Sequence, residues 1–214
     1  GGHITVEFGN EKRHTFDRVI VTAATPIASR LAPGLSAAEH ERLNRIRYQG
    51  IVCASVLMKQ QLSDYYVTNI TDQGSPFTGV IEMSALVDKA ELGGRHLVYL
   101  PKYVASDDPF LAVPDEAVEA RFLGAVERMY PNFNRANVEA FRISRVRQVV
   151  ALPTLNYSKL VPPQITSIPG LYLINTSQIV NGTLNVNETV QLGNKSAHVI
   201  LSEPYERPLA RKVA

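Results

Sequence analysis

The chain has 214 residues, 45% of them hydrophobic, which is enough for one large domain or for one domain and part of another. Lys and Arg (22) nearly balance Asp and Glu (20), so the net charge of +2 gives no electrostatic reason to expect nucleic-acid binding. Because Cys53 is the single cysteine and the five histidines show no ligand spacing, we expect neither a disulfide nor a metal site.

Membrane and export signals are not visible in the sequence. No uninterrupted apolar run approaches the roughly 18 residues that a membrane-spanning helix needs. The first ten residues, GGHITVEFGN, lack the basic and apolar regions of a signal peptide. We therefore expect a soluble, cytoplasmic chain.

The first 45 residues predict a hairpin and two short helices. Residues 3–8 alternate polar and apolar side chains and residues 18–22 are rich in β-branched ones, so the two segments are predicted to pair as a hairpin. Pro26 suits the first turn of a helix that runs to about Leu31. Ser36, with Glu39 three residues later, is a capping-box pattern that predicts a second helix to about residue 45.

The middle of the chain predicts an antiparallel sheet with one long helix. Short turns separate the predicted strands, and short connections favour antiparallel neighbours. The strands are expected at residues 50–59, 65–71, 78–84, 95–102 and 138–150. Val118, Phe122 and Val126 recur at helical spacing between Pro114 and Pro131, so a helix over residues 114–130 should lie on this sheet.

The last third of the chain predicts a short buried strand, a polar loop and a helix. The strand follows Pro169 at residues 171–175, and the helix runs from about 184 to 201 with Val186, Val190 and Ile200 facing inward. The whole pattern predicts an α+β fold, with a central, mainly antiparallel or mixed sheet of about six to seven strands and helices on one face.

A polar loop between this strand and helix is the strongest functional signal. The start of a helix presents free backbone N–H groups and the positive end of the helix dipole, which suit an anionic or carbonyl-rich ligand. An ordinary strand-to-helix turn would give the same pattern.

Three segments resemble one enzyme family. Residues 168–201, IPGLYLINTSQIVNGTLNVNETVQLGNKSAHVIL, resemble the carboxy-terminal flavin-contacting segment of the FAD-dependent amine oxidase and protoporphyrinogen oxidase-like oxidoreductases. Residues 16–35, FDRVIVTAATPIASRLAPGL, resemble the family's hairpin and the segment after it, and residues 76–104 resemble strands of its substrate domain. The resemblance implies a flavoenzyme that oxidises a C–N or C–C bond by hydride transfer to FAD.

The chain departs from the family pattern in two places. The family carries an acidic residue after the GLYLAG strand, where this chain has Asn175-Thr176-Ser177-Gln178. It also has no Gly-x-Gly-x-x-Gly, which in the family holds the ADP half of FAD. The resemblance therefore implies a carboxy-terminal, substrate-domain portion of such an enzyme, which alone should be inactive and hold FAD weakly or not at all.

The resemblance also implies a division of the chain and a set of cofactor contacts. Residues 1–35 would be a partial FAD-domain hairpin and connector, 36–168 the substrate-binding domain, and 169–214 the flavin-side strand and helix. The backbone at the helix start would face the flavin, with the polar loop as a secondary contact and small residues near the dinucleotide. These cofactor-binding candidates are Gly182, Thr183, Leu184, Asn185, Thr176, Ser177, Gln178, Ala23, Ala24 and Thr25.

Substrate-binding candidates come from the predicted sheet. Arg145 and Arg147 share a strand face and could grip one carboxylate or phosphate, although a solvated face is the simpler interpretation. Tyr48 and Tyr103 could line an aromatic cavity or fill the core. Glu82 lies in an apolar strand, so it either points to solvent by alternation or is a carboxylate in the cavity.

Other functions stay open. A sugar-nucleotide mutase-like flavoenzyme without net redox would also use an arginine pair, and a non-catalytic binding module would have lost the cofactor. Desaturation of an apolar lipid would place the protein at a membrane surface. In each enzymatic case the partner is a small molecule, and the sequence indicates neither a catalytic base nor an oligomeric state.

Overall fold

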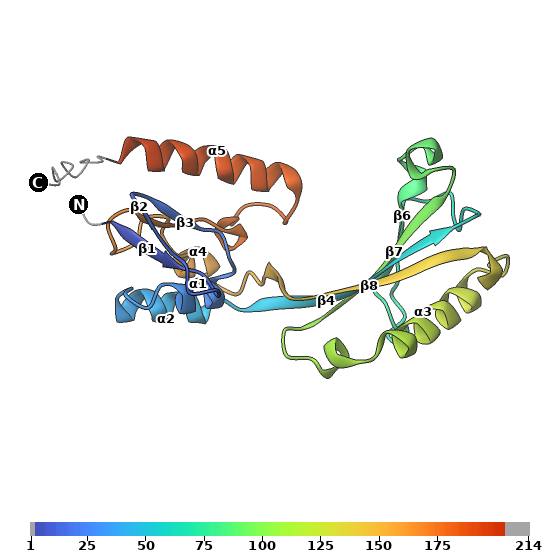
Figure 1. Ribbon diagram of the computed structural model, residues 1–214. Helices are drawn as coiled ribbons and strands as arrows, with labels where there is room; N and C mark the ends of the chain where they lie inside the picture. The colour runs from blue at the N-terminus through green and yellow to red at the C-terminus, as the bar shows by residue number, and fades with distance from the viewer. Residues whose placement is uncertain (1–2, 204–214) are drawn as a thin grey trace, which may run out of the picture. The chain divides into compact units, whose positions relative to one another are not determined.

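The computed structural model describes residues 3–203, which form two compact units (Figure 1). The first unit combines described residues from 1–47 and 150–214, and the second is formed by residues 48–149. Residues 36–47 and 150–168, expected in the substrate domain, therefore belong with the two chain ends. The last residues of the expected 169–214 segment, from 204 onward, lie outside the described part.

The second unit is built on a five-stranded sheet with strand order β5-β6-β7-β4-β8. The pairs β5–β6 and β6–β7 are antiparallel, as their short connections predict, and β4 pairs with β7, also antiparallel, although two strands separate them in sequence. The strands are β4 (Tyr48–Met58), β5 (Val67–Asn69), β6 (Gly79–Glu82), β7 (His96–Ala105) and β8 (Val138–Ala151).

One face of this sheet carries the core. Along β4 every second residue is buried, beginning with Tyr48, and the residues between them are half-buried. The predicted helix is present as α3 (Asp115–Met129), and its fully buried Val118 and Phe122 join Val52 and Leu100 of the sheet in one apolar cluster. Burial of a large apolar side chain contributes about 1.5–3 kcal/mol, so this face holds the unit together.

The first unit contains a hairpin and a parallel pair of strands. The hairpin joins β1 (Ile4–Glu7) to β2 (Arg13–Phe16), whereas β3 (Val19–Val21) pairs in parallel with β9 (Leu171–Leu173). The predicted pairing of residues 3–8 with 18–22 is therefore wrong. β2 is exposed along its whole length and shows no alternation in its sequence, so its partnership with β1 was hidden.

Helices cover the β3–β9 pair. The helices of this unit are α1 (Thr25–Leu31), α2 (Ala37–Arg45), α4 (Tyr157–Leu160) and α5 (Val186–Ser202). α1 and α2 pack against β9 through a small apolar cluster that includes Ala28, Leu43 and Leu171. Figure 1 shows α5 on the other side of the strands from α1 and α2.

Helix α5 does not bury the residues that its periodicity predicts. Ile200 is buried, but Val186 is 77% exposed and Val190 is 54% exposed. The sequence pattern identifies an apolar stripe on α5. Within residues 3–203, no other element covers this stripe along the first two turns of the helix.

Short 3-10 turns complete the connections. They lie at Met83–Ala85, Lys89–Leu92, Pro109–Ala112, Arg135–Asn137 and Thr176–Gln178.

The capping box predicted for α2 is present and also holds a distant loop. The Ser36 amide donates to the Glu39 carboxylate at 2.9 Å, and the Glu39 amide donates to Ser36 Oγ at 3.3 Å. The Ser167 amide donates to the other Glu39 oxygen at 2.7 Å. Partial burial acts to raise the pKa of Glu39, but the hydrogen bonds from Ser167 and Ser36 outweigh it and lower the pKa from 4.5 to about 2.

Replacing Glu39 by Gln should therefore weaken the fold in a pH-dependent way. A depressed carboxyl pKa stabilises the folded state above the unfolded pKa of 4.5, and this contribution disappears as the pH falls to about 2. We expect a loss of about 1–2 kcal/mol at pH 7 that shrinks towards zero near pH 2, measured by urea unfolding. Glu41→Gln is the control, because Glu41 makes only an exposed pair with Arg45. A difference that stays the same at all pH values would contradict this role of Glu39.

Gly170, at the entrance to β9, should tolerate no side chain. Its φ is +84°, and a Cβ there would lie 2.6 Å from the Asp17 carbonyl oxygen. Gly170→Ala is expected to lower the free energy of unfolding by about 2 kcal/mol or more. The control is Gly9→Ala, because a Cβ at residue 9 meets nothing within 4 Å. In thermal unfolding its melting temperature should stay close to that of the unsubstituted chain. Equal melting temperatures for the two variants would show that the close approach at residue 170 is not a constraint.

Candidate functional site

The carboxyl ends of β3 and β9 are joined by one buried side chain. Asn175, two residues after β9, donates from Nδ2 to the Ala23 carbonyl at 2.9 Å. Its Oδ1 accepts from the Ser177 amide and hydroxyl at 3.0 and 2.6 Å. Ligands of parallel sheets bind beyond the carboxyl ends of the strands, so Asn175 sets the geometry of the edge where a cofactor would lie.

The polar loop after β9 is held mostly by its own side chains. Gln178 Nε2 donates to the Leu173 and Pro162 carbonyls at 3.0 and 3.1 Å, and the Tyr157 hydroxyl donates to the Ser177 carbonyl at 2.6 Å. Ser177 is fully buried. The half-buried Thr176 side chain makes no hydrogen bond to any described residue. Of the three loop candidates, Thr176 is the one whose side chain is free to meet a ligand.

The small residues at the end of β3 start helix α1. The Ala24 carbonyl accepts from the amides of Ile27 and Ala28, both at 2.9 Å. Thr25 is fully buried, whereas Ala23 and Ala24 are half-buried. A ligand could therefore approach the two alanines, whereas the Thr25 side chain is packed in the interior at the start of α1.

The beginning of α5 is open to solvent. Asn185 caps the helix by accepting from the Glu188 amide at 2.9 Å, and its Nδ2 donates to the Thr183 carbonyl at 3.0 Å. Residues 181–187 are exposed, and the first two helical amides have no acceptor among the described residues. Gly182 has a φ of +115°, and its missing Cβ leaves room for the Glu188 carboxyl. The predicted residues Gly182, Thr183, Leu184 and Asn185 thus surround an accessible helix start.

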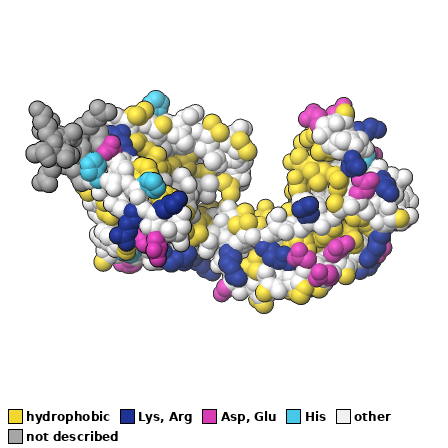
Figure 2. Space-filling view, in the orientation of Figure 1, with side chains coloured by type: hydrophobic (Ala, Val, Ile, Leu, Met, Phe, Trp, Pro, Cys, Tyr) yellow, Lys and Arg dark blue, Asp and Glu magenta, His cyan; other side chains and the backbone are white. Residues whose placement is uncertain are grey.

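The second unit offers an apolar sheet face. Opposite the core face, Ile51 pairs with Tyr103 and Ser55 with Tyr99 across β4 and β7. Tyr103 is 45% exposed. Figure 2 shows hydrophobic side chains gathered over the β5–β6–β7 end of this sheet. This face could contact an apolar or aromatic group.

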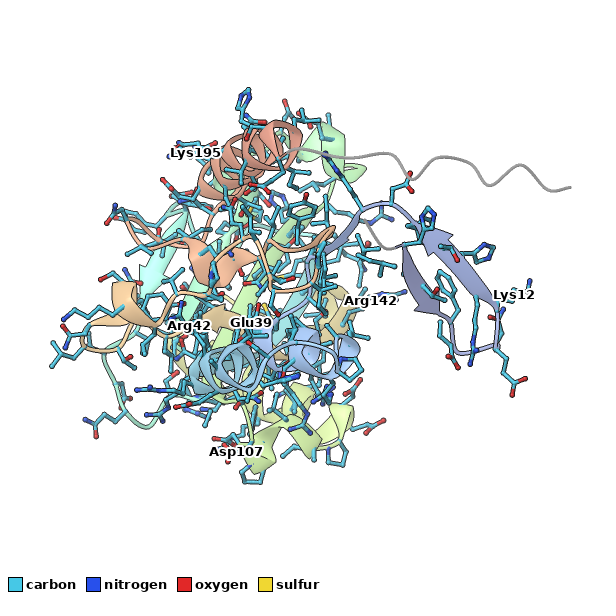
Figure 3. All side chains as sticks on the ribbon, turned by 90° about the vertical axis from the view of Figure 1, so that its left-hand side faces the viewer. Lys12, Glu39, Arg42, Asp107, Arg142 and Lys195 are labelled. Carbon is cyan, nitrogen blue, oxygen red and sulfur yellow. The ribbon has the colours of Figure 1, made fainter. Side chains whose placement is uncertain are left out.

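The two predicted arginines are used inside the second unit. Arg145 donates to the Val113 carbonyl at 2.6 Å and pairs with the Asp115 carboxylate at 2.6 Å. Arg147 donates to the Ser106 carbonyl at 3.1 Å. These contacts tie β8 to the segment before α3 and to the first residue of that helix, and the two guanidinium groups do not converge on one anion site. By contrast Arg142, labelled in Figure 3, is exposed.

Glu82 and Tyr48 are both buried, so the interpretation of Glu82 as a solvent-facing residue is wrong. Glu82 is fully buried on the core face of the sheet, because it pairs with Val98 across β6 and β7. One of its oxygens accepts from the Leu62 amide at 3.1 Å. Tyr48 is 8% exposed. Of the substrate candidates, Tyr103 is the one that lies on the open sheet face.

Within residues 3–203 there is neither a metal-ligand cluster nor a helix suited to span a membrane. Residues 3–203 contain no group of three or more His, Cys, Asp or Glu side chains arranged to hold a metal ion. In the same residues, no helix combines the length and apolar character needed to cross a bilayer.

Solved structures show the same fold in larger proteins. A putative protoporphyrinogen oxidase from Exiguobacterium sp. 255-15 has a TM-score of 0.70 at 14% identity, covering 94% of this chain and 44% of that one. An oxidoreductase from Methanosarcina mazei has a TM-score of 0.66 at 19% identity, covering 92% and 49%. A reduced UDP-galactopyranose mutase has a TM-score of 0.66 at 13% identity, covering 94% and 45%. The chain thus spans less than half the length of these proteins.

A family model gives the assignment that the fold alone does not. No curated protein matches the chain. Residues 1–201 match the model described as flavin containing amine oxidoreductase, which covers nearly the whole sequence and includes all the strand, loop and helix elements of the candidate site. The chain belongs to the flavin-containing amine oxidoreductase family.

Proposed function

We propose that this chain supplies the substrate-binding sheet and one wall of the flavin site of an FAD-dependent oxidoreductase. The reaction would oxidise a C–N or C–C bond by hydride transfer to FAD. The observation that carries the proposal is the exposed start of α5, which follows the β9 strand and presents amides without acceptors among the described residues.

The residues at this place fit a flavin by their donor chemistry. The backbone amides after Asn185 and the positive end of the α5 dipole suit the carbonyl oxygens of a flavin ring and favour negative charge there. Thr176 adds a hydroxyl, and Ala23 and Ala24 permit close approach. When bound, the flavin would supply the hydride acceptor, and the protein would contribute position and electrostatics.

The phosphate-binding part of the cofactor has no matching cradle in this sequence. A Gly-x-Gly-x-x-Gly turn is absent, and that turn normally brings backbone amides to the pyrophosphate. The 214-residue chain alone is therefore proposed to bind FAD weakly or not at all and to be inactive.

The open sheet face is proposed to contact the substrate. Its half-buried aliphatic and aromatic side chains, among them Tyr99 and Tyr103, would exclude water and orient an apolar group of the substrate. Mutase chemistry has less support, because Arg145 and Arg147 are engaged with protein groups. No other observation on the described residues favours it.

The absorption spectrum of the protein expressed from its complete reading frame tests the proposal. We expect flavin bands between about 370 and 450 nm that bleach when an amine or other reduced substrate is added, because hydride transfer reduces the flavin. A protein that stays colourless after incubation with FAD would reject the flavoenzyme assignment.

Gly182→Val should remove the bound flavin. Valine is strained at a φ of +115°, and its Cβ would meet the Glu188 carboxyl at about 3.2 Å, so the helix start would be displaced. The flavin-to-protein absorbance ratio is expected to fall at least tenfold. Gly193→Ala in the same helix is the control, because its Cβ meets nothing within 4 Å and alanine favours the helix.

Circular dichroism distinguishes loss of the site from loss of the fold. A folded Gly182→Val protein with normal flavin content would contradict the assignment of this loop to the cofactor. If Gly182→Val unfolds, Asn185→Ala, which removes only the cap, should still lower flavin content by a measurable factor. Unchanged content in that variant would also contradict the assignment.

A further inference from the structure

An apolar cavity of about 200 Å³ lies between the β3–β9 strands and the helices α1 and α2. Its walls include Ala28 of α1, Ala32 directly after that helix, Leu43 of α2, and Leu171 and Leu173 of β9, all of them buried. An engineered cavity of about 150 Å³ with similar lining stays dry and binds benzene, so this one has room for a group somewhat larger than benzene. The small alanine side chains keep the space open.

The loop wall of the cavity is rigid. Pro162 and Pro163 line it, and both have a restricted φ. Ser167, just beyond this wall, donates its amide and hydroxyl to Glu39 at the beginning of α2. Glu39 also lines the cavity, but four donor groups from Ser36 and Ser167 already satisfy its carboxylate. The wall is thus held open without a ligand, which lowers the cost of binding one.

The mouth of the cavity is cationic. Arg42 lines the cavity and also a neighbouring hollow of about 220 Å³, where it, Arg45 and Lys159 outnumber the single carboxylate, Glu41. Among residues 3–203, the side chains of Arg42 and Lys159 make no hydrogen bond or ion pair, and Arg45 makes one long contact of 3.8 Å with Glu41. Figure 3 labels Arg42 and Glu39. Two cations without partners therefore stand beside an apolar space.

We propose that this cavity binds a small amphipathic anion, with its apolar chain between α1, α2 and β9 and its carboxylate or phosphate head at Arg42 and Lys159. The guanidinium group matches either head in a bidentate geometry. The apolar chain gains about 25 cal/mol for each Å² it removes from water. The cavity is lined by residues other than those assigned to the cofactor, so the proposal is independent of the flavin assignment.

Isothermal titration of the 214-residue chain with octanoate and octyl phosphate tests the proposal. Saturable binding of at least one of them, with one site per chain, is expected, and the tighter of the two identifies the head group. Octylammonium should bind at least tenfold more weakly, because its charge is opposed by Arg42 and Lys159. The proposal is overturned if neither anion binds saturably or if octylammonium binds equally well.

Variants separate the charged mouth from the apolar interior. Arg42→Ala should weaken anion binding at least fivefold, while Arg128→Ala on α3, in the other unit, should leave it unchanged. Ala32→Leu should fill the cavity and abolish binding. If circular dichroism shows that Ala32→Leu does not fold, Ala38→Leu, at an exposed helix position lining both hollows, takes its place. Unchanged affinity in the folded filling variant, or in Arg42→Ala, would refute the site.

Discussion

The first unit depends on a parallel pairing between residues that lie about 150 positions apart in the sequence. β3 and β9 are each three residues long, too short to hold together by backbone hydrogen bonds alone. The pairing is completed at one end by the Val19 amide donating to the Gly170 carbonyl at 2.9 Å, and at the other by Asn175 reaching Ala23. Because both the loop after β9 and the start of α1 leave from this end, the candidate cofactor site exists only where the two chain segments meet.

The second unit separates stability from recognition by the two faces of one sheet. The residues that face α3 form a continuous apolar core, and it contains a buried carboxylate, Glu82, of which one oxygen accepts from the Leu62 amide and the other has no partner among the described residues. The opposite face keeps half-exposed aromatic and aliphatic side chains. If the open face contacts the substrate as proposed, a change there would alter those contacts at little cost to the core, and one fold could serve different substrates.

Local signals in the sequence predicted local structure well. The Ser36–Glu39 box and the periodicity of residues 114–130 act over a few residues, and both helices are present. Non-local relations were harder to predict. The partner of β3 is distant in sequence, and the partners of Arg145 are a carbonyl and a carboxylate some 30 residues earlier, so the arginine spacing alone suggested an anion site. An asparagine two residues after a buried strand, with a serine two residues on, was the available sign of the Asn175 turn.

The candidate cofactor site relies on backbone groups more than on particular side chains. At the start of α5 the ligand-facing donors would be peptide amides, which any residue except proline supplies. Side chains matter there chiefly for conformation, since Gly182 permits a positive φ and Asn185 ends the preceding loop. A site of this kind can keep its electrostatics while its sequence diverges. A backbone-based site would therefore be compatible with the 13–19% identity between this chain and the solved structures that share its fold.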